Sequence, residues 1–232
     1  MEWGGQLNVI QLGPFMLNFE LLILIISAFV GYLGLRYRLS KAEVEASIRD
    51  KFVTALIISL IVWKFSLIVF DPITVLQYPL SLLYFNGGDK GLWLAVVISL
   101  IYVWIRSRGD GTSLWLNVDV ISIGLMAGSG TYHLLLLMKD TSNILFHLLY
   151  ISFVAGLLVF LNISKRAVGN PIIINQLVIW FSLGMVGIFF AVKERSYMFL
   201  SFSLEQIFFL FILVITIVVG NMVEKKVAED VE

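Results

Sequence analysis

The chain has 232 residues, of which 59% are hydrophobic and 14% are charged, and its mean hydropathy is +0.96. This composition excludes an ordinary soluble domain and is typical of a polytopic membrane protein. The formal charge is zero and cysteine is absent, so we expect no nucleic-acid partner, no disulfide and no thiolate chemistry. With only two histidines, His133 and His147, we expect no metal site and no cofactor.

Apolar stretches near the length that a bilayer-crossing helix needs, about 20 residues, recur along the whole chain. We count seven, at 19–35, 52–70, 91–105, 115–138, 143–162, 171–192 and 197–223. The segment 75–85 contains Pro79 and is too short to cross, so it is expected to lie at the interface or to re-enter the membrane. The sequence therefore predicts an all-α, seven-transmembrane-helix bundle that forms one integral membrane domain over residues 1–232.

Lysine and arginine residues are distributed unevenly between the two sets of connecting segments. Eleven lie in the segments that follow spans one, three, five and seven. The other four lie in the segments that follow spans two, four and six. Because cytoplasmic loops are enriched in basic residues, the N-terminus is predicted to be external and the C-terminus cytoplasmic.

The break Asn86-Gly87-Gly88-Asp89-Lys90 interrupts the apolar stretch between spans two and three. Glycines permit backbone angles that are closed to other residues, and non-helical backbone near a bilayer requires protein or water around it. Two interpretations stay open, a simple loop or the edge of a site, with Asn86, Gly87 and Gly88 as candidate binding residues.

Ionisable residues within the spans are candidates for a site because they are costly in a bilayer. Lys64, in span two, is a candidate to bind a lipid phosphate, or to snorkel outward, or to pair with a carboxylate such as Asp71 or Glu20. Asp119, near the start of span four, either caps its helix or belongs to a site.

Two further candidates lie later in the chain. Gly124 and Gly128 have the four-residue spacing that allows close helix packing, and His133 follows them as a packing residue or a base. Glu205 opens span seven and requires a partner, for which Lys64 or His133 would be suitable.

Several segments resemble those of the bacterial prolipoprotein diacylglyceryl transferase family. In chain order, the similar segments are Leu12-Gly13-Pro14, 62–70 with Lys64 in place of an arginine, 78–88, Asn117-Val118-Asp119-Val120-Ile121, and 200–206. The resemblance implies a seven-helix bundle in the bacterial cytoplasmic membrane with openings that face lipid. It also implies a transferase that moves a diacylglyceryl group from phosphatidylglycerol to a lipoprotein cysteine.

The positions that match the family's functional residues differ in this chain. Leu92 occupies the place of the family's essential histidine, and Ser129 and Tyr132 replace the arginine and asparagine of its signature helix. Glu20 stands at the first-span tyrosine, and Arg195 is a candidate for a late headgroup arginine. Positioned acid–base groups contribute roughly a hundredfold to ten-thousandfold in rate, so the parent mechanism is not expected to operate.

Three functions follow as hypotheses. The first is a divergent family member that binds phospholipid, such as phosphatidylglycerol, or lipidated protein in an intramembrane cavity without the parent chemistry. The second is an active diacylglyceryl or acyl transferase that uses a relocated site formed by Lys64, His133, Glu205 and Arg195. The third is a structural subunit that interacts with another membrane protein.

Overall fold

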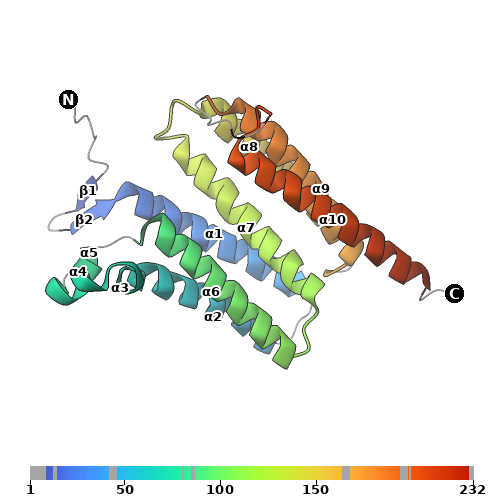
Figure 1. Ribbon diagram of the computed structural model, residues 1–232, viewed down its shortest axis with the longest axis horizontal. Helices are drawn as coiled ribbons and strands as arrows, with labels where there is room; N and C mark the ends of the chain where they lie inside the picture. The colour runs from blue at the N-terminus through green and yellow to red at the C-terminus, as the bar shows by residue number, and fades with distance from the viewer. Residues whose placement is uncertain are drawn as a thin grey trace. The chain divides into compact units, whose positions relative to one another are not determined.

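A computed structural model describes residues 9–12, 15–41, 46–79, 81–84, 87–163, 168–193, 198 and 200–229. This part of the chain is almost wholly helical (Figure 1), as the sequence predicted. The exception is a small antiparallel hairpin of β1 (Val9–Leu12) and β2 (Phe15–Asn18), in which Val9 lies opposite Asn18.

Each predicted span overlaps one long helix. The long helices are α1 (Phe19–Lys41), α2 (Ala46–Phe65), α6 (Gly88–Gly109), α7 (Leu114–Leu136), α8 (Ile144–Ile163), α9 (Pro171–Ile188) and α10 (Leu204–Glu229). Short helices α3 (Leu67–Phe70), α4 (Pro72–Gln77), α5 (Ser81–Tyr84) and η1 (Phe189–Ala191) lie between them.

Five helices in the described part, α1, α6, α8, α9 and α10, are long and apolar enough to cross a membrane. Charged residues interrupt the apolar sequence of α2, and Asn117, Asp119 and His133 interrupt that of α7. The chain therefore has several helices that fit a membrane-embedded protein, while seven crossings stay a prediction.

The chain divides into two compact units, and the expected single membrane domain stays a prediction. The larger unit contains residues 1–41 and 118–232, and the smaller unit contains residues 42–117.

In the larger unit, α1 and α7 approach one another through glycines. A Cβ atom added to Gly31 would lie 2.8 Å from the carbonyl oxygen of Gly124 and 3.4 Å from Cα of Gly128. A Cβ atom on Gly128 would lie 3.1 Å from the carbonyl oxygen of Ser27. The spacing of Gly124 and Gly128 thus does serve close packing, as small residues do at helix contacts in membranes.

A buried ion pair ties the same two helices together. Arg38 Nε and Nη2 donate to the two carboxylate oxygens of Asp119 at 3.1 and 2.9 Å, and both side chains are buried. The backbone N–H of Gly169, which has a φ of +79°, donates to Asp119 Oδ2 at 2.7 Å. Asp119 therefore does not cap α7, where the Leu116 N–H instead donates to Ser113 Oγ.

The rest of the larger unit packs α8, α9 and α10 around an apolar core. The buried core residues are Ile123, Met126, Phe146, Tyr150, Val154, Leu157, Leu161, Ile173, Leu177, Met185 and Ile188. The helix α9 begins at a strong N-cap. Asn170 Oδ1 accepts from the N–H groups of Ile172 and Ile173, and Pro171 occupies the first turn.

A capping box opens α10. The Ser203 N–H donates to Gln206 Oε1 at 2.9 Å, and the Gln206 N–H donates to Ser203 Oγ at 3.4 Å. Gln206 is fully buried, and its Nε2 also donates to the Val186 carbonyl at 2.9 Å. The polar residues here serve to fix the start of α10 against α9.

In the smaller unit, α2 and α6 pack through a stripe of small residues at four-residue spacing, Gly91, Ala95 and Ser99. Ala95 is fully buried, and Ser99 Oγ donates to the Ala55 carbonyl on α2 at 3.2 Å. A Cβ atom at Gly91 would lie 3.2 Å from the Trp63 carbonyl oxygen. The opposite face of α6 is left with exposed apolar side chains, including Leu92 and Trp93.

A buried lysine joins the far ends of this pair. Lys51 Nζ donates to Ser107 Oγ at 2.8 Å and to Thr112 Oγ1 at 3.1 Å, and it lies 3.5 Å from Asp110 Oδ2. Asn117 Nδ2 also donates to Ser107 Oγ at 2.9 Å.

Candidate functional site

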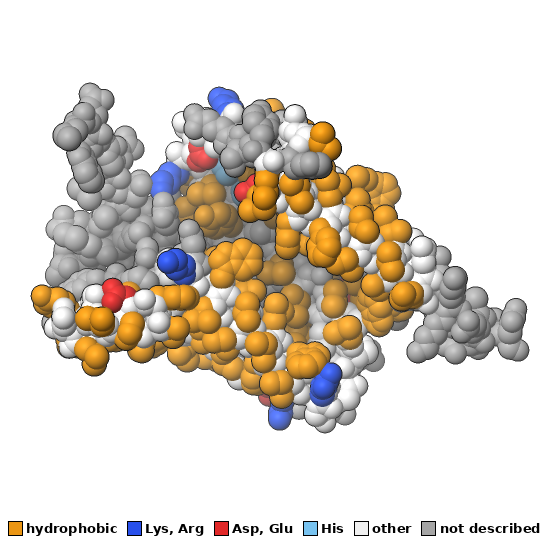
Figure 2. Space-filling view, in the orientation of Figure 1, with side chains coloured by type: hydrophobic (Ala, Val, Ile, Leu, Met, Phe, Trp, Pro, Cys, Tyr) orange, Lys and Arg blue, Asp and Glu red, His pale blue; other side chains and the backbone are white. Residues whose placement is uncertain are grey.

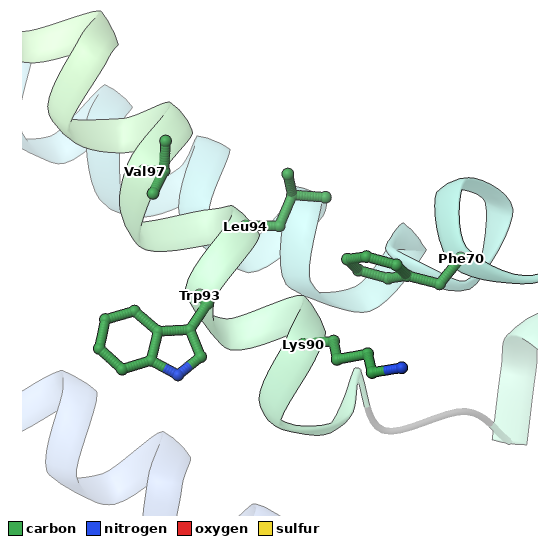
Figure 3. A pocket seen from close by; sticks show the side chains of 5 residues that line it. All are labelled: Phe70, Lys90, Trp93, Leu94 and Val97. Carbon is green, nitrogen blue, oxygen red and sulfur yellow. The ribbon is translucent and has the colours of Figure 1, made fainter. Parts of the chain in front are cut away.

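The smaller unit has an open groove where α3 meets the start of α6 (Figure 3). It has a volume of about 360 Å³ and is lined by Phe70, Lys90, Trp93, Leu94 and Val97. Trp93 is 67% exposed, Val97 49% and Phe70 47%, so apolar surface faces outward along the groove.

Lys90 is the one cation among these lining residues. Its side chain is exposed, and the ion pairs among residues whose side chains are described do not include it. In the described part of the chain, the charge at this end of the groove is therefore available to a ligand.

Gly87 and Gly88 form the beginning of α6 beside this groove. Gly87 precedes the helix with a φ of +76°, and an added Cβ atom would overlap the Trp63 ring, so only glycine fits there. Gly88 has a φ of +57° and is exposed. The first N–H groups of α6 have no partner within the helix and carry the positive end of its dipole.

The other candidates in the smaller unit lie near the same helix ends. Lys64 is half-buried in the last turn of α2, and Leu92 is 41% exposed on α6. Asn86 lies outside the described residues.

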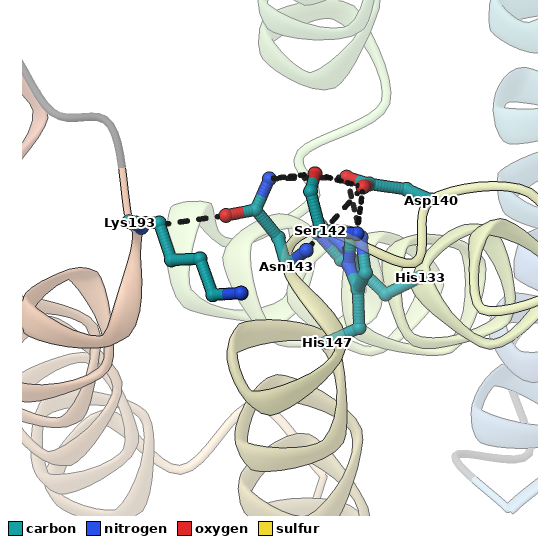
Figure 4. A network of polar contacts seen from close by, with 6 residues as sticks. All are labelled: His133, Asp140, Ser142, Asn143, His147 and Lys193. Atoms are coloured by element: carbon teal, nitrogen blue, oxygen red, sulfur yellow. Dashed lines mark hydrogen bonds and ion pairs between the residues drawn. The ribbon is translucent and has the colours of Figure 1, made fainter.

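The larger unit contains a polar network where α7 meets α8 (Figure 4). His133 Nδ1 lies 2.9 Å from His147 Nδ1, and His147 Nε2 lies 3.3 Å from Asp140 Oδ2. His133 is half-buried and His147 is buried. Asn143 extends the network, because its Oδ1 accepts from the Lys193 N–H at 3.4 Å.

The remaining candidate residues of the larger unit make separate contacts and do not converge on one site among the described residues. Ser129 donates to the Met126 carbonyl at 3.3 Å and shares a side-chain hydrogen bond with Tyr150, whose ring stacks 4.0 Å from that of His133. Tyr132 makes an edge contact with His133 at 5.7 Å. Glu205 is exposed in the first turn of α10.

The relocated transferase site stays a prediction. Arg195 lies outside the described residues, and no side chain is described for Glu20. Lys64 belongs to the smaller unit, while His133 and Glu205 belong to the larger one. Among the described residues, no three histidine, aspartate or glutamate side chains come together as metal ligands.

Sequence reasoning missed several residues of these two places. In the groove, Lys90, Trp93, Leu94 and Val97 follow the i, i+3, i+4, i+7 spacing of one helix face, a pattern readable from sequence. In the network, the polar run 139–143 is followed by His147 one turn into a helix. The sequence predicts His133 as a packing residue or a base but does not show that its polar partner is His147, the second histidine of the chain.

No protein-family model matches the chain, and comparisons with curated proteins and with solved structures gave no match. The resemblance to the prolipoprotein diacylglyceryl transferases stays a prediction from residue patterns.

Proposed function

We propose that this protein is an integral membrane protein that binds an anionic phospholipid in the groove of the smaller unit. The lipid phosphate lies at Lys90 and the first turn of α6, and an acyl chain lies along Trp93, Leu94 and Val97. The observation that carries the proposal is an exposed lysine at the end of an open groove that is otherwise lined by apolar side chains.

The shape of the lining supports a lipid over a small polar ligand. From Lys90 to Val97 the helix rises about 10 Å at 1.5 Å per residue, so the apolar residues follow the cation along one helix face. A lysine is a compact point charge that suits a phosphate, and backbone N–H groups at a helix start favour anions. Hydrophobic side chains cover most of the visible helix surface (Figure 2), which suits a lipid environment.

The charge distribution supports one orientation of this groove. With an external N-terminus and a cytoplasmic C-terminus, the start of α6 faces the external side, so the phosphate site lies in the outer leaflet. The resemblance supports the bacterial cytoplasmic membrane as the location and seven crossings as the topology.

In this proposal the chain is a divergent relative of the diacylglyceryl transferases that keeps lipid binding without the parent chemistry. Leu92 and Ser129 at the positions of the family's histidine and arginine support this interpretation. A hydrocarbon side chain cannot move a proton, and a hydroxyl without charge holds a phosphate more weakly than a guanidinium does.

The test is lipid retention by the purified full-length protein. Native mass spectrometry would measure bound phosphatidylglycerol against phosphatidylcholine after exchange from mixed-lipid nanodiscs. Hydrogen bonds to charged groups are worth about 1.5–3 kcal/mol, so Lys90→Gln should lower phosphatidylglycerol retention roughly tenfold. Val97→Trp, which fills the groove, should lower retention of both lipids.

Lys193→Gln is the matched control, because this exposed lysine is predicted to lie on the same side of the membrane. It should leave retention unchanged. Equal phosphatidylglycerol retention by the wild type, Lys90→Gln and Val97→Trp would contradict the proposal.

A relocated transferase is the second candidate, and the hydrogen bonds around His133 favour it. A base supported by a second histidine and a carboxylate is an arrangement suited to acid–base chemistry. The test is genetic, because an active enzyme should restore growth to a strain depleted of its authentic diacylglyceryl transferase. Absence of growth with normal protein levels would argue against transferase activity.

A further inference from the structure

Asp140, in the turn between α7 and α8, is a carboxylate surrounded by donors. Its Oδ1 accepts from the N–H groups of Ser142 at 2.9 Å and Asn143 at 3.3 Å, and Oδ2 accepts from Asn143 Nδ2 at 3.2 Å. Hydrogen bonds from the Ser142 hydroxyl and the Asn143 side chain hold the pKa of Asp140 well below its usual value. Asp140 is therefore ionised at neutral pH and can only accept hydrogen bonds.

This fixes the protons on both histidines. Because Asp140 only accepts, His147 must donate from Nε2, so the neutral His147 ring bears a lone pair on Nδ1. His133 must then donate from its own Nδ1 across the 2.9 Å contact. The lone pair of the neutral His133 ring is consequently on Nε2, at the end of the chain of hydrogen bonds.

The surroundings of the pair are mostly aromatic. The rings of Tyr132, Phe146 and Tyr150 pack around His133 at centroid distances of 5.7, 5.4 and 4.0 Å. Phe189 of η1 packs on Phe146 and brings no charge. The titratable described groups in printed contact with the pair are Asp140, Tyr132 and Tyr150. Lys139 precedes Asp140 in the chain, and the backbone N–H of Lys193 donates to Asn143.

We propose that Asp140, His147 and His133 form a site that binds one proton, with His133 Nε2 as the accepting atom. When Nε2 takes up a proton, the Nδ1 proton of His133 can pass to Nδ1 of His147. The positive charge then lies on the ring that Asp140 contacts, and His133 returns to a neutral state with its proton on Nε2. This site lies in the larger unit and is independent of the proposed lipid groove.

A second proton is excluded by the same geometry. If both rings were protonated, both Nδ1 atoms would be donors 2.9 Å apart, and two positive charges would face each other. The pair therefore takes one proton while α7 and α8 keep this contact, and the second requires the contact to break. The geometry gives the bundle an acid–base group that neither histidine would provide alone.

The experiment is nitrogen NMR of the two imidazole rings in the full-length protein, labelled at histidine and held in nanodiscs. Because the chain has only two histidines, their four ring nitrogens are resolved without other signals of that kind. At about pH 8 the spectrum should show one ring protonated at Nε2 and the other at Nδ1. As the pH is lowered, the pair should take up one proton, and the spectrum should then show one charged ring for the two histidines. Two rings with the same tautomer, or two independent one-proton titrations, would overturn the proposal.

Asp140→Asn sharpens the measurement, because an amide offers both a donor and an acceptor to His147. We expect it to replace the single His147 tautomer by a mixture. Asp71→Asn is the matched control, since Asp71 likewise accepts from its own turn, through Thr74, but belongs to the smaller unit. It should leave both rings as in the wild type. If Asp140→Asn does not fold, the wild-type spectrum decides the proposal alone.

Discussion

Two helix pairs of this protein bury a basic side chain in different ways. In the larger unit, Arg38 of α1 meets the carboxylate of Asp119 through two hydrogen bonds, so a full charge faces a full charge. In the smaller unit, Lys51 of α2 donates mainly to the neutral hydroxyls of Ser107 and Thr112, and Asp110 lies farther away at 3.5 Å.

The difference determines how much the stability of each helix pair depends on its buried basic side chain. Asp119 is 1% exposed, so removal of Arg38 would leave a buried carboxylate that keeps one described donor, the Gly169 N–H. Asp110 has an 18% exposed side chain and its Oδ1 accepts from Thr112, whereas its Oδ2 is buried without a hydrogen bond and faces Lys51. We infer that loss of Arg38 destabilises its helix pair more than loss of Lys51 does, because Asp119 is buried whereas Asp110 is partly exposed.

The largest expected effect comes from Arg38→Ala. Removing one partner of a buried ion pair costs about 3–5 kcal/mol because the other charge is left uncompensated. Denaturant unfolding of the protein in detergent would measure the loss. The double variant Arg38→Met with Asp119→Leu should recover most of it, short of about 1–3 kcal/mol for the Gly169 N–H that loses its acceptor. A double variant no more stable than Arg38→Ala would contradict the uncompensated-charge explanation.

A smaller effect is expected from Gly31→Ala, which tests the glycine contact beside the ion pair. The new Cβ atom would press on the backbone of Gly124 and Gly128, and overpacking of this kind costs about 1–3 kcal/mol. Gly156→Ala in α8 is the control, because a Cβ atom there meets nothing within 4 Å. It should be neutral or slightly stabilising. Equal stability of both variants would mean that α1 and α7 are not in backbone contact.

The smallest effect is expected from Lys51→Met. Ser107 keeps Asn117 as its partner and Thr112 keeps Asp110, so no hydroxyl is left unsatisfied. We expect the free energy of unfolding to fall by no more than about 1.5 kcal/mol, the net worth of one ordinary hydrogen bond, because the change also removes a charge that burial disfavours and the Asp110 carboxylate left behind is partly exposed. A loss as large as that of Arg38→Ala, in the same unfolding assay, would show that Asp110 depends on the ammonium.

Local sequence patterns predicted the helices, but they did not predict which distant segments contact one another. The apolar periods located every long helix, and the spacing of Gly124 and Gly128 predicted a close helix contact. The partners Ser27 and Gly31 could not be chosen from one sequence, because many helix pairs have compatible small residues. The same limit hid the pairing of Arg38 with Asp119, two residues 81 positions apart.

Short motifs also matched where the structure does not use them. Ser40 followed by Glu43 fits a capping box, yet Ser40 lies in the last turn of α1, where its hydroxyl donates to the Tyr37 carbonyl. Among the described residues, Ser203 and Gln206 do form a capping box. The groove was harder to predict from the sequence than the helices, because it arises from α3 and α6 together. Most of its lining residues are also ordinary apolar side chains.

The final helix, α10, is also a suitable place to attach a fusion partner. At 1.5 Å per residue, α10 measures about 39 Å, whereas its apolar stretch Leu204–Met222 measures about 28 Å, close to the thickness of a hydrocarbon core. Its last two turns thus extend past the apolar stretch as continuous helix. A soluble helical domain whose first helix continues α10 after Glu229 would be connected rigidly to the membrane-embedded part. Such a fusion would add the mass and asymmetry that electron microscopy needs to align particles of a 26.2 kDa membrane protein.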